Sequence, residues 1–297
     1  MISIVIPCNR VGGIDVLAST LREQSLQDFE LILVDELRPY RRGTVPQIGR
    51  GSWHIGPNAR LRWSNYMRQL NIGLELARGE LVLFLSDYTA LSPETLATHA
   101  AFHATADPKA VMLGGIEYTS IPPLHPDFPR LYGWSKIGHD PANYSDATYA
   151  PWLDKKRRHE LYEEFRVDYE RDLDSGRLAP FMTSVFETDF AGWKDTESLK
   201  VWERNMRGPP SQFMNLKNDS MRTDLLRSIG GFDERADGTH GHQDSITHRQ
   251  LMRVGATFHP VPEAPAVRIL DPHGIAIIRR TGLDDDANLK IYAEVAG

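Results

Sequence analysis

The chain has 297 residues, of which 41% are hydrophobic and 25% charged. These values are ordinary for a globular protein whose core is large enough to need no disulfides. A net charge of −6 argues against a non-specific nucleic-acid binder, although a local basic patch would be compatible with it. The lone cysteine, Cys8, excludes an internal disulfide and favours a reducing compartment. The sequence has no signal-peptide pattern and no apolar run of about 18 residues, so we expect a cytoplasmic protein whose membrane contacts, if any, are peripheral.

Short apolar runs alternate with helical patterns over the first 115 residues. Strands are predicted at 2–6, 29–34, 81–85 and 110–114, and helices at 16–24, at 64–78 and from Ser92 onward. Gly79 is expected to cap the helix at 64–78. Fully apolar strands that alternate with helices are typical of a parallel sheet covered on both faces. We therefore predict an α/β fold with a mostly parallel central sheet.

Polar residues follow three of the predicted strands at their carboxyl ends. In open α/β sheets, ligands bind at this edge. The candidate ligand-binding residues are Pro7, Asn9 and Arg10 after the first strand, Asp35 and Glu36 after the second, and Ser86 and Asp87 after the third.

The rest of the chain has two different characters. Residues 120–215 are rich in proline, aromatic and charged residues, and we interpret them as a helical and loop elaboration of the sheet. Two further helices are predicted at 222–229, followed by Gly230-Gly231, and at 245–254, followed by Gly255. We expect a single domain over 1–297, with a ligand-binding half at 1–115, an insertion at 116–214 and a second half at 215–297.

Five stretches, taken in order, resemble a known family. They are IVIPCNR (4–10), FELILVDE (29–36), NIGLELARGELVLFLSDY (71–88), NDSMRTDLLRSIGGFDE (218–234) and HQDSITHRQLMRVG (242–255). Together they resemble the family 2 type of glycosyltransferase, which has the nucleotide-sugar-binding GT-A fold. The resemblance covers about 1–115 and 215–260, over half of the chain.

The resemblance implies a nucleotide-sugar donor, a UDP- or GDP-sugar, over the strand ends. Asp35 would accept from the base or ribose, and its alternative role is that of a turn-forming aspartate. Glu36 replaces a second aspartate that is common in the family. Pro7 and Asn9 would shape the base pocket, and Arg10 would meet phosphate or lie in solvent.

Asp87 lies where the family usually has D-x-D, whose last carboxylate commonly binds a divalent cation, Mn²⁺ or Mg²⁺. Such a cation neutralises the charge on the leaving nucleoside diphosphate. Here the triplet is Ser86-Asp87-Tyr88. Three interpretations remain open: Asp87 holds a metal with help from other groups; basic groups or a helix N-terminus replace the metal; or transferase activity has been lost. Some relatives use a late histidine as an additional ligand, and His273 is placed to do so.

On the acceptor side, the resemblance implies that Asp244 is the general base. Its acidic neighbour in the family is replaced here by Gln243, so only Asp244 offers a carboxylate to the acceptor hydroxyl. The alternative is an N-cap for the helix that follows. Asp233 in GGFDE would bind acceptor or sugar hydroxyls, or would stabilise a turn.

The resemblance thus implies a hexosyltransferase-type glycosyltransferase that inverts the anomeric carbon. Its acceptor could be a carbohydrate, lipid, protein or modified nucleic acid. The alternatives are a retaining glycosyltransferase or nucleotidyltransferase of similar fold, and an inactive nucleotide-sugar-binding protein.

Overall fold

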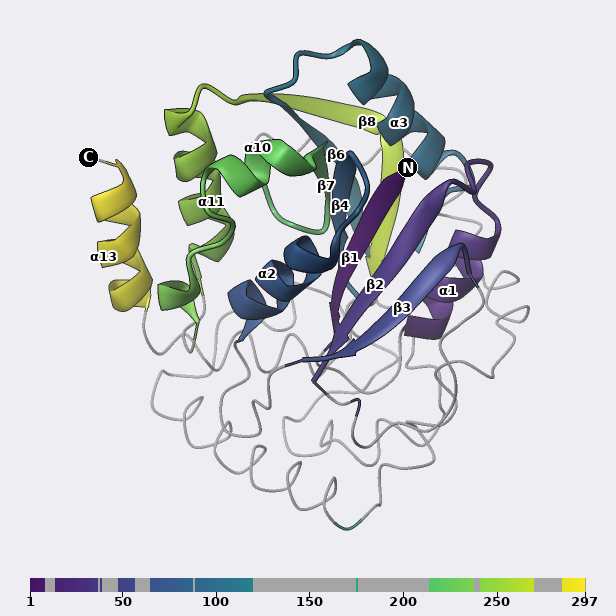
Figure 1. Cartoon of the computed structure of the whole chain (residues 1–297), viewed down its shortest axis with the longest axis horizontal. Coiled ribbons are helices and arrows are strands. Elements are labelled where there is room, and N and C mark those ends of the chain that lie inside the picture. Colours follow the sequence, from purple (N-terminus) through teal and green to yellow (C-terminus); the bar gives the residue numbers. More distant parts are fainter. Residues whose placement is uncertain are drawn as a thin grey trace.

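A computed structural model describes residues 1–8, 14–36, 38, 48–56, 65–87, 89–119, 175, 214–237, 241–269 and 285–296. Its centre is an eight-stranded sheet in the order β3-β2-β1-β4-β7-β6-β8-β5 (Figure 1). The strands are β1 (Ile2–Cys8), β2 (Phe29–Asp35), β3 (Arg50–Ile55), β4 (Leu81–Leu85), β5 (Thr89–Leu91), β6 (Ala110–Thr119), β7 (Asn218–Arg222) and β8 (Thr257–Ile269). The helices are α1 (Ile14–Arg22), α2 (Tyr66–Leu76), α3 (Thr95–Thr105), α10 (Thr223–Ser228), the 3₁₀ helix η3 (Glu234–Ala236), α11 (Gln243–Arg253) and α13 (Asp285–Ala296).

The sheet is mixed but mostly parallel. Strands β3, β2, β1 and β4 pair in parallel, as do β6 and β8. Strand β7 runs antiparallel between β4 and β6, and β5 is antiparallel to β8. The predicted α/β architecture is therefore confirmed.

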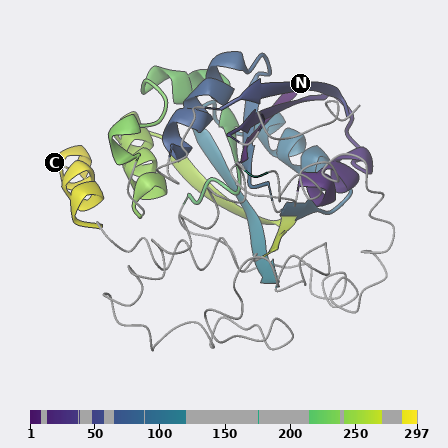
Figure 2. The ribbon, with the colours of Figure 1, turned by 90° about the horizontal axis from the view of Figure 1, so that it is seen from below.

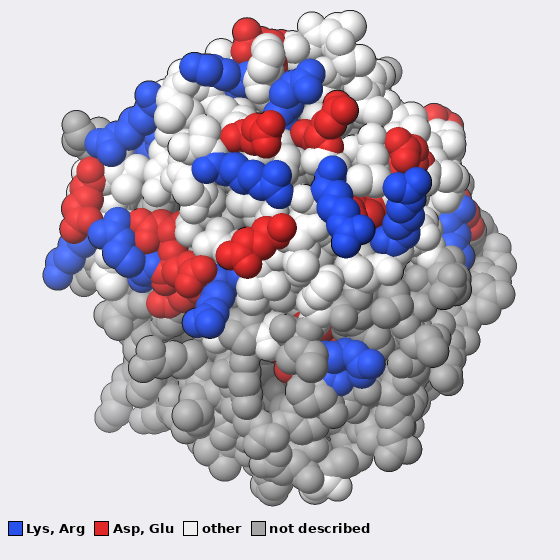
Figure 3. All heavy atoms as spheres, in the orientation of Figure 1, with Lys and Arg blue, Asp and Glu red and all other residues white. Residues whose placement is uncertain are grey.

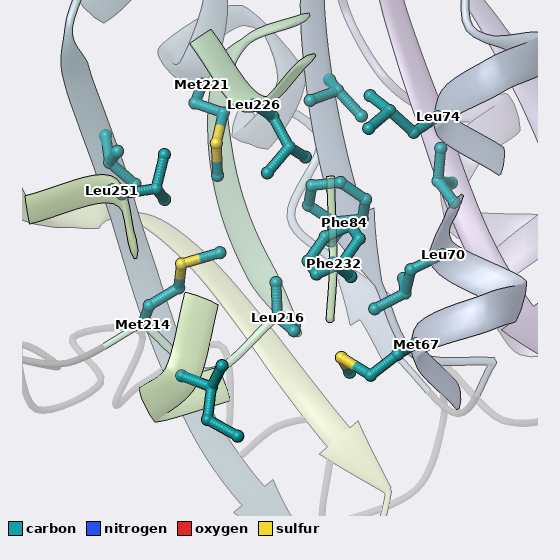
Figure 4. Packing of buried hydrophobic residues seen from close by; sticks show 14 of the residues in the cluster. Met67, Leu70, Leu74, Phe84, Met214, Leu216, Met221, Leu226, Phe232 and Leu251 are labelled. Carbon is teal, nitrogen blue, oxygen red and sulfur yellow. The ribbon is translucent and has the colours of Figure 1, made fainter. Parts of the chain in front are cut away.

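Helices cover both faces of the sheet because side chains alternate along each strand. Val82 and Phe84 of β4 join one apolar cluster, which includes residues of α2, α10, α11 and α13. Leu81, Leu83 and Leu85 join the other, with residues of α1 and α3. Figure 4 shows part of the first cluster, where the rings of Phe84 and Phe232 meet edge to face with centroids 5.1 Å apart. In Figures 1 and 2, α13 lies beside α11 at one side of the sheet.

Helix α2 packs unusually close to β1. Met67, Leu70 and Leu74 are buried at helical spacing against the sheet. Gly73 permits the close approach, since a Cβ there would come within 2.2 Å of a Val5 methyl group. The predicted cap was wrong: the helix ends at Leu76, Ala77 is its extended C-cap, and Gly79 lies beyond it.

Several predicted boundaries shift in the structure. Strand β1 continues through Pro7 to Cys8, because Pro7 lies beyond the part of β1 that pairs with β4 and pairs only with β2. Helix α3 starts at Thr95 rather than Ser92, and α11 starts at Gln243. The helix-terminating glycines Gly230, Gly231 and Gly255 have positive φ angles, as the sequence predicted.

Strand β7 presents polar side chains to both faces of the sheet. On the α3 face, Ser220 Oγ lies 2.7 Å from His99 Nδ1 and 2.9 Å from His103 Nε2, and Asn218 Oδ1 lies 3.1 Å from His99 Nε2. The Asn218 amide also donates to the Gly115 and Ala264 carbonyls. Asp219, between them in the sequence, faces the other way. The sequence prediction missed β7 altogether.

No helix in the described ranges combines the length and hydropathy needed to cross a bilayer.

Candidate functional site

The carboxyl ends of β1, β2 and β4 meet at one edge of the sheet, because these strands are adjacent and parallel. Cys8 lies opposite Asp35 in the register of β1 and β2. Gln69 of α2 holds these two strand ends together, since its Nε2 donates to the Cys8 carbonyl at 3.3 Å and the Val34 carbonyl at 3.1 Å. The predicted ligand-binding residues Pro7, Asp35, Ser86 and Asp87 therefore belong to neighbouring strand ends.

Asp35 and Glu36 form the end of β2. Asp35 is 2% exposed, and its carbonyl accepts from the Arg38 and Gly56 amides. The Glu36 amide donates to the Cys8 carbonyl at 2.9 Å. Burial, together with the charges of Asp35 and Asp237, raises the pKa of Glu36 to about 8. Glu36 is therefore largely neutral at pH 7 and can donate a hydrogen bond as well as accept one.

Asp237 brings the GGFDE segment to this edge. Its two carboxylate oxygens accept from the Met67 amide at 2.8 Å and the Arg68 amide at 3.0 Å, so it caps the first turn of α2. Burial raises the pKa of Asp237 to about 6 against the opposing effect of these two hydrogen bonds. No local pattern indicates this contact, because Asp237 lies 170 positions after Met67 and 169 positions after Arg68.

Ser86 and Asp87 follow β4, and the Asp87 side chain is buried at 2% exposure. The Ser86 hydroxyl donates to Asp87 Oδ1 at 3.4 Å. Within the described ranges, no group of three or more His, Cys, Asp or Glu side chains is arranged to hold a metal ion. The residues that the structure describes therefore do not by themselves make a cation site. Tyr88 and the predicted ligand His273 lie outside those ranges, as do Asn9 and Arg10.

Asp244 lies in the first turn of α11. The helix begins at Gln243 behind His242, which has the left-handed φ of 60° and gives no side-chain cap. Asp244 therefore lies within the first turn and is not the N-cap, and its role as a general base stays a prediction. Its Oδ1 accepts from the Ser245 amide at 2.8 Å. The half-buried carboxylate thus lies at the positive end of a helix, where negative charge is favoured.

Neighbouring groups fix the loop in front of Asp244. The Gln243 side chain accepts from the Gly241 amide at 3.1 Å and donates to the Ala236 carbonyl at 3.4 Å. From α13, the Asn288 amide donates to the Gly241 carbonyl at 2.7 Å. Gln243 thus supplies a link between η3 and α11 that requires an amide, because its side chain both donates and accepts.

Asp233 makes local contacts. Its carboxylate caps η3 by accepting from the Arg235 amide, and it pairs with the Arg235 guanidinium at 2.6 Å. These bonds lower the pKa of Asp233. Arg235 also binds Glu294 of α13 at 2.8 Å. These contacts are those of a turn-stabilising residue, and a role toward the acceptor stays a prediction.

Asn71 at the middle of α2 holds the segment around Phe232. Asn71 Oδ1 accepts from the Phe232 amide at 2.8 Å, and Asn71 Nδ2 donates to the Phe232 carbonyl at 2.9 Å. Gly231, with φ of 80°, must be a glycine, since a Cβ would lie 2.6 Å from Asn71 Oδ1. The stretches 71–88 and 218–234, which the sequence analysis treated separately, therefore meet in one contact at Asn71.

The surface in Figure 3 carries Lys and Arg interspersed with Asp and Glu over its described part. This mixed pattern gives no extended basic face in that part of the view, in agreement with the net charge of −6.

No model of a protein family matches the sequence, and no curated protein matches it. Among solved structures, GalNAc-T7 with UDP, GalNAc and Mn²⁺ aligns with a TM-score of 0.52 and 12% identity over 99% of this chain and 47% of that chain. TarS 1–349 of S. aureus aligns with a TM-score of 0.49 and 14% identity over 99% of this chain and 70% of that chain. The mannosyltransferase PcManGT from Pyrobaculum calidifontis, with GDP-Man and Mn²⁺, aligns with a TM-score of 0.47 and 14% identity over 99% of this chain and 73% of that chain.

At 12% identity, the likeness to GalNAc-T7 concerns the fold alone, and this chain spans about half the length of that one. It agrees with the mixed sheet and the helices on both faces, and the predicted GT-A-like α/β fold is confirmed.

Proposed function

We propose that the protein is a glycosyltransferase that moves a sugar from a nucleoside-diphosphate sugar to an acceptor hydroxyl. The observation that carries the proposal is the arrangement of the sheet edge. The ends of β1, β2 and β4 bring Pro7, Asp35 and Asp87 together, and α11 presents Asp244 from its first turn. The GT-A-like fold, and a structural neighbour that was solved with UDP, GalNAc and Mn²⁺, support a nucleotide-sugar donor.

In the proposed reaction, the acceptor oxygen attacks the anomeric carbon while Asp244 takes the hydroxyl proton. The bond from the anomeric carbon to the diphosphate breaks, and the nucleoside diphosphate leaves with the electron pair. A single in-line displacement of this kind inverts the anomeric carbon. Asp35 and neutral Glu36 would bind the nucleoside, and Asp87 would lie on the diphosphate side.

A divalent cation near Asp87 and His273 is part of the proposal only as a prediction, and none of the steps above passes through it. A bound Mn²⁺ or Mg²⁺ would stabilise the charge of the leaving diphosphate.

The test begins with thermal shifts in a panel of UDP- and GDP-sugars, each with and without Mn²⁺. We expect a shift that is specific for one donor. Shifts of equal size for every donor, with Mn²⁺ making no difference, would count against both a specific donor and a metal.

With the donor known, turnover is compared in wild type, Asp244→Asn and the control Asp224→Asn. Asp224 lies in α10, and its side chain is 97% exposed. We expect Asp244→Asn to lower kcat by about 10²- to 10⁴-fold, the usual contribution of a general base, and Asp224→Asn to leave it unchanged. Equal turnover in all three proteins would sink the assignment of the base. NMR of the anomeric proton in the product decides between inversion and retention.

A further inference from the structure

Two consecutive residues in the turn before α11 have left-handed backbone angles. Gly241 has a φ of 107°, and His242, the N-cap residue of α11, has a φ of 60°. For a residue with a side chain this conformation is unfavourable, and it persists only where surrounding contacts hold it. The His242 side chain makes no capping hydrogen bond of its own. The start of α11, and with it the position of Asp244 two residues on, therefore depends on the contacts of this turn.

Gly241 is held by hydrogen bonds on both sides. Its amide donates to Gln243 Oε1 at 3.1 Å, and its carbonyl accepts from Asn288 Nδ2 at 2.7 Å. The first bond is local, whereas the second comes from α13, 47 positions further along the chain. The next carbonyl, that of His242, accepts from the Ile246 amide at 2.8 Å and so begins the helix. Asn288 thus fastens the turn to a different helix.

The Asn288 side chain is fully buried, at 0% exposure, and its Oδ1 has no hydrogen-bond partner in the part of the chain that the structure describes. A buried oxygen without a partner lowers stability. Packing of α13 does not require an amide, since Ile291 and Val295, which follow at helical spacing on the same buried face, are apolar and join the core cluster. The bond to the Gly241 carbonyl is therefore what an asparagine supplies at this position.

Helix α13 is itself anchored beside α11 (Figure 1). The Tyr292 hydroxyl accepts from Arg249 Nε of α11 at 2.9 Å, and the Tyr292 ring lies 5.9 Å from the His242 ring, measured between centroids. Glu294 binds Arg235 of η3 at 2.8 Å. The support to which Asn288 fastens the turn is therefore fixed to both elements that flank it.

We propose that Asn288 is a positioning residue for the general base: by holding the Gly241 carbonyl, it fixes the first turn of α11, which carries Asp244. The proposal rests on the function proposed above. A general base acts only within hydrogen-bond reach of the acceptor hydroxyl, and a displacement of about 1 Å can cost about 10²-fold in rate. Loss of this bond should therefore lower kcat and leave the binding of the donor, at the ends of β1, β2 and β4, unchanged.

The first measurement compares turnover in full-length wild type, Asn288→Ala and two controls on α13. Lys290→Ala changes an exposed residue, and Ile291→Val removes a methyl group from the buried face, so it lowers the Tm without touching Gly241. In Asn288→Ala we expect kcat to fall about 10- to 100-fold with an unchanged KM for the donor. Both controls should keep the kcat of wild type, because a folded protein that is merely less stable retains its geometry.

The second measurement needs no turnover. Amide hydrogen exchange of Gly241 and Ile246 is followed by NMR in the ¹⁵N-labelled proteins and compared with that of Val82 in the core of the sheet. In Asn288→Ala we expect exchange of the two turn amides to become about five- to tenfold faster relative to Val82, since one hydrogen bond that closes the turn is lost. In Ile291→Val and Lys290→Ala this ratio should stay as in wild type.

Unchanged exchange in Asn288→Ala would overturn the hold of α13 on the turn. Faster exchange with an unchanged kcat, or an equal fall of kcat in Ile291→Val, would overturn the positioning role and leave the proposed function standing. Faster exchange in a protein whose wild type transfers no sugar would confirm the hold and refute the proposed function. If Asn288→Ala does not fold, Asn288→Asp takes its place, because it keeps the shape of the side chain but cannot donate to the Gly241 carbonyl.

Discussion

Strand β7 meets two different environments on its two faces. On the α3 face, Asn218 and Ser220 join His99 and His103 in a chain of neutral hydrogen bonds, at whose end His103 Nδ1 has no partner within the described residues. On the α11 face, Asp219 keeps one oxygen without a hydrogen-bond partner within the described residues, and its pKa is raised to about 7. Both sets of side chains are buried to the same degree, at 0% to 2% exposure. The two faces therefore differ in the kind of group that burial acts on: it lowers the pKa of two imidazoles on one face and raises the pKa of a carboxylate on the other.

The directions of the hydrogen bonds on the α3 face follow from the ends of the chain. Both amide hydrogens of Asn218 go to carbonyls, so its Oδ1 accepts from His99 Nε2. His99 Nδ1 then accepts from the Ser220 hydroxyl, and the Ser220 oxygen accepts from His103 Nε2. Polar groups buried with their partners define a rigid structure, whereas a buried carboxylate with a raised pKa is typical of a functional site.

The largest expected effect comes from removing His99, which contacts both Asn218 and Ser220 on the α3 face. In His99→Ala, a cavity forms and Asn218 Oδ1 loses its donor. We expect a loss of about 3 to 5 kcal/mol in the free energy of unfolding, the usual cost of truncating a large core side chain. Urea unfolding at pH 7 measures it. The control, His259→Ala, changes an exposed histidine of β8 and should cost under about 1 kcal/mol. Equal costs for the two variants would refute the structural importance of the chain.

Acid should weaken the same face without any substitution. Burial lowers the pKa of His99 and of His103 to about 4, and for His103 the charges of Arg222 and His259 add to the effect. A lowered histidine pKa means that the unfolded state binds more protons. Stability from this source is complete above pH 6.5 and is lost as the pH falls toward 4, at most by about 3 kcal/mol for each histidine.

Urea unfolding between pH 7 and pH 4.5 measures this loss. His103→Gln keeps a donor for Ser220 but does not titrate, so its stability should fall less steeply with acid than that of wild type. Identical pH profiles would show that His103 takes no part.

On the α2 face, the half-buried side-chain amide of Asn71 has hydrogen-bond partners for both its oxygen and its nitrogen. It tests whether hydrogen bonding on that face is equally important. In Asn71→Ala, the Phe232 amide and carbonyl lose their partners, at an expected cost of about 1 to 3 kcal/mol. Asn71→Asp can still accept from the Phe232 amide but cannot donate to the Phe232 carbonyl. Its free energy of unfolding should lie between those of wild type and Asn71→Ala. Chemical denaturation compares the three proteins, and a fully stable Asn71→Ala would contradict the expectation.

The fold was predictable where strands are apolar throughout. The run 81–85 is buried at every position, and the α2 pattern buries Met67, Leu70 and Leu74. Strand β7 was not predictable, because NDSMR lacks the aromatic and branched residues that signal a strand. Its polar residues are tolerated only because partners about 120 residues away, on α3, satisfy them.

The candidate site was predictable to a similar extent. Asp35, Ser86 and Asp87 could be placed because they directly follow apolar strands, and Asp244 because it opens a helix. The contacts of Asp237 with α2 and of Asn288 with the Gly241 carbonyl join distant parts of the chain, and no local pattern reveals them. The raised pKa of Glu36 likewise comes chiefly from burial, with smaller contributions from Asp35 and from Asp237, some 200 positions away.

The smallest effect is expected at Glu36, which lies at the proposed donor edge. Like Asp219, it is a carboxyl group whose pKa is raised chiefly by burial. Its pKa, raised to about 8 chiefly by burial, means that it is neutral below pH 8 and becomes charged above it. Under the proposed function, that charge would repel the donor diphosphate. We expect the affinity for UDP or GDP to fall about fivefold from pH 7 to pH 9, the effect of a repulsion of about 1 kcal/mol.

Isothermal titration calorimetry measures this change in affinity. Glu36→Gln should bind without this pH dependence, and Glu80→Gln, at an exposed position, should behave as wild type. If Glu36→Gln keeps the full pH dependence, the neutral form of Glu36 has no part in binding the nucleotide.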